Sequence, residues 1–159
     1  MDLVGQAVGG DFAFERKIVL SADGERVAIA ARTRKETTTL NYVVVYEWTG
    51  SVWIQLGANL HEEAGNDRLG DSLALSGHRV AIGAPWNDGN GDRSGHVRIF
   101  EFTKNNWNQV GQDLDDIAAW EQSGSSVALS SNGNRVVIMA DRWVTFAFSN
   151  GPRTGPGFN

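Results

Sequence analysis

The sequence predicts an all-β fold built from β-propeller blades, and three observations support this prediction. The composition favours short strands and tight turns, because glycine is abundant (19 residues), proline is rare (3 residues) and valine, isoleucine and aromatic residues recur in short bursts. One sequence pattern occurs three times, at intervals of 53 and 56 residues. We divide each copy into four short strand-like segments, which is the number of strands in a propeller blade.

The repeat is clearest in an apolar segment that begins with arginine. Its three copies, RVAIAA, RVAIGA and RVVIMA, occupy residues 26–31, 79–84 and 135–140. A shorter segment that ends in Leu-Ser precedes each copy, at residues 18–21, 73–76 and 127–130. A third pattern, Trp-x-Gln-x-Gly, starts at Trp53 and again at Trp107. Because these patterns recur in the same order, the chain is interpreted as a repeat protein.

We expect each repeat to form four antiparallel strands, named A to D in chain order. Strand B of the second repeat, residues 80–84, is apolar at every position, which is typical of a strand buried on both faces. Its small residues Ala81 and Gly83 would let neighbouring sheets approach closely. Asp23-Gly24 and Asn132-Gly133 predict tight A–B hairpins, since both dipeptides are strong hairpin signals.

The period divides the chain into three blades and a tail. The blades are expected at approximately residues 9–60, 61–114 and 115–148. A single strand at residues 3–8 matches the end of a repeat and precedes them. Residues 149–159 are rich in glycine and proline and are expected to be irregular, so that the third blade ends at its strand C.

Three blades are too few for a closed ring, because propellers have about 4–8 of them. The extra strand at residues 3–8 and the incomplete third blade are complementary. We therefore expect a homodimer in which residues 3–8 of each copy complete the third blade of the other, which closes a six-bladed ring. The alternative is that the chain is part of a longer propeller.

Charge and hydropathy argue against several classes of function. The net charge is −5 and the lysines and arginines are scattered, so no basic stripe for nucleic acid is visible. No apolar run approaches the roughly 18 residues that a membrane helix needs. The chain has no cysteine for a disulfide, a thiolate nucleophile or a metal site, and residues 1–6 show no signal-peptide pattern.

A family resemblance rests on two segments around a Gly-rich loop. Residues 80–85 have the sequence VAIGAP, and residues 95–100 have the sequence GHVRIF. Together they resemble the Gly-Ala-Pro half of FG-GAP repeats, which form the blades of integrin α-subunit propellers, and the resemblance covers about residues 3–148. It implies a propeller and an extracellular or cell-surface recognition module. Some propellers with similar blades are lectins, and enzymes are a minority.

The calcium loop of integrin-like blades is not expected here. That loop is the A–B link, which in this chain is residues 21–26 or 76–79 and lacks enough spaced oxygen ligands. The best cation candidate is instead in the second B–C link, where Asp88, Asn90 and Asp92 alternate as in the opening of a calcium loop. No bidentate acid follows, so we expect at most a weak calcium site, with a polar hairpin tip as the alternative.

Two tryptophans outside the repeat pattern indicate a ligand-binding face. Trp53 and Trp107 recur and are expected to pack between blades, whereas Trp86 and Trp120 do not recur. The B–C and D–A links that carry Trp86 and Trp120 are expected on the same face, where an aromatic beside polar groups suits a sugar or protein ligand. The alternative is that these rings cover a blade edge. The candidate ligand-binding residues are Trp86, Asn87, Asp88, Trp120 and Glu121.

The function predicted from these features is non-enzymatic recognition or scaffolding through a protein or surface ligand. A lectin that uses Trp86 or Trp120 is the alternative. A glycan-active enzyme is a weaker alternative, for which paired acids in the D–A links would be needed. These acids are Glu62, Glu63, Asp67, Asp113, Asp115 and Asp116. The histidines, His61, His78 and His96, are dispersed and show no metal-site spacing, and no catalytic residue is predicted.

Overall fold

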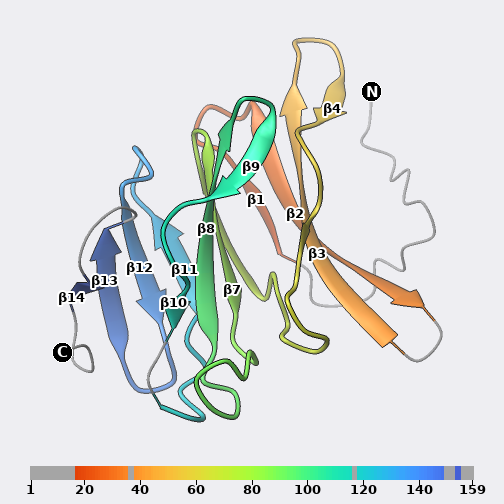
Figure 1. Ribbon diagram of the computed structural model, residues 1–159. Helices are drawn as coiled ribbons and strands as arrows, with labels where there is room; N and C mark the ends of the chain where they lie inside the picture. The colour runs from red at the N-terminus through yellow and green to blue at the C-terminus, as the bar shows by residue number, and fades with distance from the viewer. Residues whose placement is uncertain (1–16, 36–37, 116–117, 149–152, 155–159) are drawn as a thin grey trace.

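The computed structural model shows an all-β protein with three antiparallel sheets (Figure 1). It describes residues 17–35, 38–115, 118–148 and 153–154, so the predicted strand at residues 3–8 lies outside the described part. Among the described residues, no helix is long and apolar enough to cross a membrane. The predicted all-β class is confirmed.

The first sheet has the order β1, β2, β3, and two short strands pair with β3, one with its C-terminal end and the other with its middle. Its strands are β1 (Ile18–Leu20), β2 (Arg26–Lys35), β3 (Thr38–Trp48), β4 (Trp53–Gln55) and β5 (Leu60–His61). The expected strand D is therefore divided into β4 and β5. The expected boundary between residues 60 and 61 falls inside β5.

The second sheet repeats this layout. Its strands are β6 (Ser72–Ser76), β7 (Arg79–Ala84), β8 (His96–Thr103), β9 (Asn106–Gln109) and β10 (Leu114–Asp115). Both β9 and β10 pair with β8, so strand D is again divided into two parts. Because the second part returns to the start of β8, it places Asp115 opposite His96.

The third sheet contains one strand that the sequence did not predict. Its order is β11 (Ser126–Leu129), β12 (Arg135–Met139), β13 (Val144–Phe148) and β14 (Arg153–Thr154). The prediction that the third blade ends at strand C and that residues 149–159 are irregular was wrong at β14. Phe146 and Ala147 pair with Thr154 and Arg153 through backbone hydrogen bonds that need no particular side chain, so sequence patterning gave no signal.

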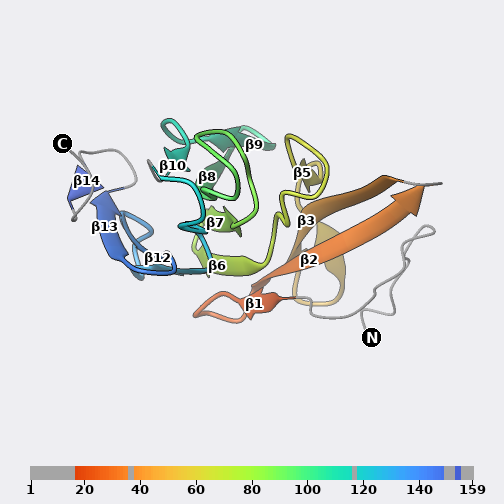
Figure 2. The ribbon, with the colours of Figure 1, turned by 90° about the horizontal axis from the view of Figure 1, so that it is seen from below.

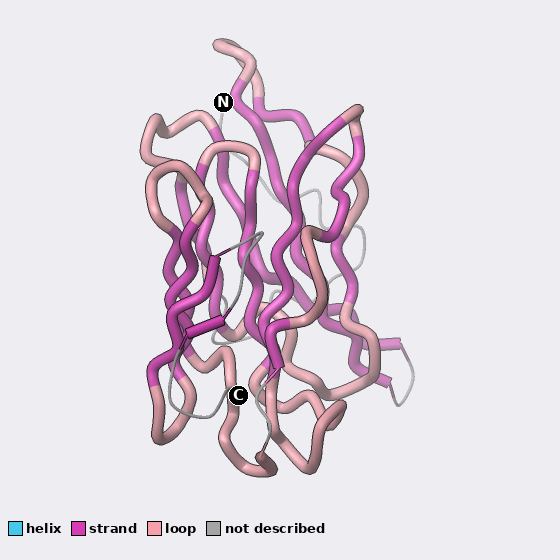
Figure 3. The backbone as a smooth tube through the Cα atoms, turned by 60° about the vertical axis from the view of Figure 1, so that its left-hand side comes forward, coloured by secondary structure: helices cyan, strands magenta, loops and turns pink. Residues whose placement is uncertain are grey.

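The sheets lie next to one another in an arc (Figure 2). The first strands of the sheets lie together, since β6 contacts both β1 and β11, as the inner strands of a propeller do. The antiparallel strands are aligned with one common axis, so the links between them gather at two ends of the molecule (Figure 3). The described residues do not form a closed ring.

Two hydrophobic cores fill the spaces between the sheets. The first lies between the first and second sheets and the other between the second and third. Strand β7 serves both cores, because Val80 and Ile82 face the first and Ala81 faces the second. All five residues from Val80 to Ala84 are buried, which confirms the prediction that this strand is covered on both faces.

Polar contacts between neighbouring sheets also follow the repeat. Arg26 Nη1 donates to Gly77 O at 2.7 Å, and Arg79 Nη1 donates to Gly133 O at 3.1 Å. Each arginine also pairs with a glutamate of its own sheet, Glu47 or Glu101.

The indole of Trp107 donates to Leu56 O of the first sheet at 2.7 Å, as expected for a blade-packing tryptophan. Trp107 also lies against Phe102, with ring centroids 5.1 Å apart.

Candidate functional site

The links at one end of the sheets are joined by backbone hydrogen bonds. Trp120 N donates to Asp92 O at 2.8 Å, and Gln122 N donates to Arg93 O at 3.0 Å. Trp86 N donates to Asp67 O at 3.2 Å, which ties the same B–C link to the preceding D–A link. The prediction that the links carrying Trp86 and Trp120 lie on one face is consistent with these contacts.

Four side chains from these links form a continuous stack. The guanidinium carbon of Arg68 lies 3.4 Å from the centroid of the Trp86 ring, and that of Arg93 lies 4.1 Å from it. Arg93 also lies 5.1 Å from the centroid of Trp120. Cation–π attraction therefore links Arg68, Trp86, Arg93 and Trp120, which we call the Arg–Trp stack.

The stack is locally basic in a chain of net charge −5. Arg68 has an exposed and long ion pair with Asp71, at 3.7 Å. Among the described residues, no carboxylate forms an ion pair with Arg93, whose side chain is held by aromatic rings. A guanidinium held in this way keeps its donors available for a carboxylate ligand.

Unusual backbone conformations are concentrated in the same links. Of seven non-glycine residues with positive φ in the described part, two lie in the β8–β9 hairpin and five in these links. The five are Asn66, Arg68, Arg93, Trp120 and Gln122. Three of them carry side chains of the Arg–Trp stack. Such conformations persist where surrounding contacts fix them, and they are frequent at binding sites.

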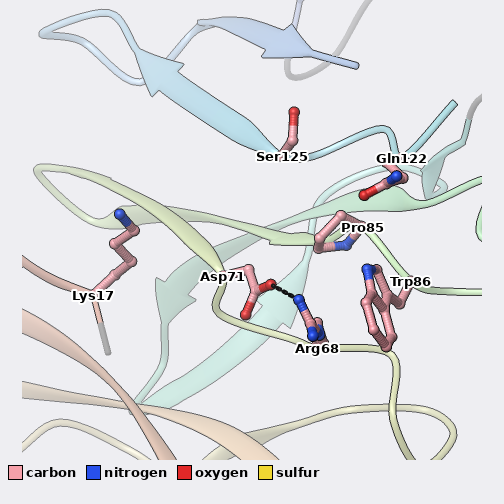
Figure 4. A pocket seen from close by; sticks show the side chains of 7 residues that line it. All are labelled: Lys17, Arg68, Asp71, Pro85, Trp86, Gln122 and Ser125. Carbon is pink, nitrogen blue, oxygen red and sulfur yellow. Dashed lines mark ion pairs between the residues drawn. The ribbon is translucent and has the colours of Figure 1, made fainter. Parts of the chain in front are cut away.

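A pocket of about 430 Å³ lies beside the stack, on the Arg68 side of Trp86 (Figure 4). Lys17, Asp71 and Ser125 line it, and each of them directly precedes the first strand of its sheet. They are equivalent positions of the repeat, 54 residues apart. The remaining lining residues are Arg68, Pro85, Trp86 and Gln122.

Asn87 and Glu121, two of the predicted ligand-binding residues, are buried. The amide of Asn87 donates to Asp67 Oδ2 at 2.9 Å, and its Oδ1 accepts from Gly89 N at 2.8 Å. Asn87 therefore shapes the link that carries Trp86. Glu121 Oε2 has no hydrogen-bond partner among the described residues.

The predicted calcium ligands Asp88, Asn90 and Asp92 are exposed at the tip of the B–C link. Asp88 Oδ1 accepts a hydrogen bond from Arg93 N at 2.8 Å, so one carboxylate oxygen already stabilises the turn. The carbonyl of Asp92 accepts from Trp120 N. Calcium binding at this link stays a prediction.

A second cluster was not predicted from the sequence. Glu63, His96 and Asp113 each place one potential metal-ligand atom within 4.8 Å of the others. His96 begins β8, and Asp113 lies just before β10. Burial lowers the pKa of His96 below its ordinary value, and the neighbouring Asp113 carboxylate opposes that shift. The acids were visible in the sequence, but the return of β10 to His96 was not.

The comparison with known families agrees with the sequence resemblance. A family model described as the FG-GAP repeat matches residues 61–100, which include β6, β7, Arg68, Trp86 and His96. No curated protein matches the chain. Residues 61–100 are therefore similar to the FG-GAP repeat, as the resemblance implied.

Proposed function

We propose that this chain is a non-enzymatic recognition module that binds acidic groups on a protein ligand. The Arg–Trp stack carries this proposal, because it displays two arginines beside the pocket at one end of the blades. The FG-GAP repeat and the three sheets support a propeller-type binding module. The same resemblance favours an extracellular or cell-surface location.

The geometry of Trp86 favours an acidic ligand over a neutral sugar. Sugar binding by tryptophan generally uses a ring face, and two guanidinium groups already occupy the space over the Trp86 ring, that of Arg68 at 3.4 Å and that of Arg93 at 4.1 Å from its centroid. We therefore infer that the Trp86 ring positions the guanidinium groups of Arg68 and Arg93. Lys17 is a second cation in the pocket wall, in addition to Arg68, and Asp71 is the one carboxylate among the lining residues. Bidentate hydrogen bonds from arginine to a carboxylate would give both affinity and orientation.

Carbohydrate binding is the second candidate, and the exposure of Trp120 favours it. The Trp120 side chain is 54% exposed, and Arg93 is the only cation placed against its ring among the described residues. A sugar ring would stack on the uncovered part of this indole, with Arg93 beside it to recognise an acidic sugar.

Two arrays distinguish these functions. One carries peptides with clustered aspartate and glutamate, and the other carries neutral, sialylated and uronic-acid glycans. We expect acidic peptides to bind. The Arg93→Gln variant should have an affinity at least about tenfold lower, because it loses one charge-assisted contact. Lys104→Gln, in the β8–β9 hairpin, is the charge-matched control and should bind like the parent protein.

Other array results would contradict the proposal. Glycan binding that is lost in Trp120→Ala but kept in Arg93→Gln would favour the lectin. Hydrolysis of any glycan that disappears in Asp115→Asn would contradict a non-enzymatic role. Binding to neither array would also argue against recognition of acidic groups.

We further propose that two copies assemble into one six-bladed ring. The outer faces of the arc expose apolar residues, with Ile18 and Leu20 of β1 at one end and Met139 and Val144 of the third sheet at the other. Burying these faces against each other would remove apolar surface from water. Because β14 already pairs with β13, we favour a dimer in which sheets pack face to face over a dimer that exchanges strands at this edge.

A further inference from the structure

We propose that Glu63, His96 and Asp113, with Asp115 beside them, bind a divalent transition-metal ion such as zinc. This site lies at the edge of the second sheet where β10 pairs with the start of β8. It shares no residue with the Arg–Trp stack or with the predicted calcium loop, and it does not depend on the proposed recognition function.

The surroundings of His96 are the first observation. The residue is 2% exposed, and its Nε2 has no hydrogen-bond partner among the described residues. Its Nδ1 faces two carboxylates, at 3.7 Å from Asp113 Oδ2 and 3.8 Å from Asp115 Oδ1. Hydrogen bonds between nitrogen and oxygen are usually about 2.7–3.2 Å long, so these contacts are too long. The separation between Nδ1 and these two carboxylates is therefore longer than a hydrogen bond, and an ion placed there would contact all three groups.

The spacing of the ligand atoms suits a bound ion. Nitrogen and oxygen ligands about 2.0–2.2 Å from zinc lie about 3.3–3.6 Å from one another in a tetrahedral site. The distances from His96 Nδ1 to Asp113 and Asp115 exceed this spacing by a few tenths of an ångström. Glu63 is within 4.8 Å and its side chain is 48% exposed, so it can move inward without repacking the core.

Charge also suits a divalent cation. The carboxylates of Glu63, Asp113 and Asp115 surround a histidine whose burial favours the neutral, ligand-competent imidazole. One cation, Arg98, pairs with Glu63 Oε1 at 3.1 Å. Three carboxylates and one guanidinium leave a net charge of −2, which one divalent ion neutralises. With the ion on Nδ1, the proton of the neutral imidazole is on Nε2.

Two neighbouring groups already orient the ligands. Gln109 Nε2 donates to Asp113 Oδ1 at 2.5 Å, and the other oxygen, Oδ2, faces His96. Arg98 Nη2 donates to His61 O at 2.6 Å, which fixes the guanidinium that holds Glu63. Hydrogen bonds of this kind around metal ligands set their direction.

Titration calorimetry with zinc, on protein first treated with a chelator, tests the proposal. We expect one ion per chain, with affinity reduced at least about tenfold in His96→Gln and in Asp113→Asn, as for loss of a metal ligand or its orienting group. His78→Gln is the matched control, because His78 is an exposed histidine of the same sheet's A–B turn and its loss should leave affinity unchanged. Cobalt should give a visible absorption band in the parent protein that both ligand variants lose.

Asp113→Asn keeps the test valid if His96→Gln fails to fold, because Asp113 is not buried. Circular dichroism in chelator establishes that each variant is folded. Absence of zinc binding in the parent protein would overturn the proposal. Binding that persists in folded Asp113→Asn and that is lost in His78→Gln would overturn it as well.

Discussion

Ser72 Oγ donates a buried hydrogen bond of 2.6 Å to the backbone carbonyl of Gly124, across the junction of the second and third sheets. Gly83 lies at the same junction, and a Cβ atom there would overlap both Gly124 O and Ser72 Oγ. The two sheets therefore approach to a distance that a single methyl group would prevent. The small residues of β7 thus determine how closely the blades pack.

Gly83→Ala and Ala81→Leu should both destabilise the protein. Overpacking of this kind costs about 1–3 kcal/mol, a large part of the stability of a small domain. Urea unfolding followed by circular dichroism measures the loss. Gly65→Ala is the control, because a Cβ at Gly65 meets nothing within 4 Å. Equal stability of Gly83→Ala and Gly65→Ala would contradict the close approach seen at this junction.

Replacing Arg93 with glutamine should weaken the Arg–Trp stack. A partly exposed cation–π contact contributes about 0.5–1 kcal/mol, and Arg93 makes two. We expect a loss of about 1–2 kcal/mol in unfolding free energy and a change in tryptophan fluorescence. In a double-mutant cycle with Trp86→Leu, the two effects should be non-additive. Additive effects would show that the two residues do not interact in solution.

Calcium should bind weakly, if it binds, at Asp88, Asn90 and Asp92. One oxygen of Asp88 already accepts a hydrogen bond, and the loop has no bidentate acid. Calorimetry should show either no heat or a dissociation constant of about 10⁻⁴ to 10⁻³ M. Micromolar affinity that is lost in Asp92→Ala would show that the loop is a stronger site than its ligands suggest.

Light scattering should give a mass of about 35 kDa, twice the 17.3 kDa of one chain, if two copies close a ring. Leu20→Lys and Met139→Lys should each yield a monomer, because each places a charge on an exposed apolar face of the arc. Lys104→Gln should leave the mass unchanged. A stable and well-folded monomer of the parent protein would rule out the ring.

The buried His96 should make the folded state less stable at acidic pH. Burial lowers its pKa in the folded state, so the unfolded chain binds more protons as pH falls below about 6.5, the ordinary value. Stability should therefore decrease between pH 7.5 and 5.5, by up to about 1.4 kcal/mol per pH unit from this group. Urea unfolding in chelator should show a smaller decrease for His96→Gln. Equal decreases would mean that His96 is not the source.

The repeat was predictable because its signals are local. Apolar runs and turn dipeptides determine strands, and their recurrence at residues 26–31, 79–84 and 135–140 identified the blades. Strand β14 was missed because two residues can pair through backbone groups with no characteristic side chains. The division of strand D into β4 and β5 was missed for the same reason.

The links that carry the candidate site could be named from the sequence, but the contacts between them could not. Non-recurring tryptophans indicated the face, yet the arginines that cover Trp86 come from two different links, and only the folded chain brings Arg68 and Arg93 together. The same limit applies to His96, whose neighbours Glu63 and Asp113 lie 33 residues before and 17 after it. Contacts between loops depend on the geometry of the whole sheet, which a single sequence does not encode locally.

The three pocket residues that precede the inner strands, Lys17, Asp71 and Ser125, show how this architecture can diversify. Each occupies the same place in its blade, directly before the inner strand. Backbone pairing at this place, such as the hydrogen bond from Ala30 N to Lys17 O, does not depend on the side chain, so its identity is not constrained by strand pairing. One is a cation, one an anion and one a hydroxyl. An array of duplicated blades can therefore acquire a new binding preference through one substitution per blade, while the framework that positions the pocket is inherited unchanged.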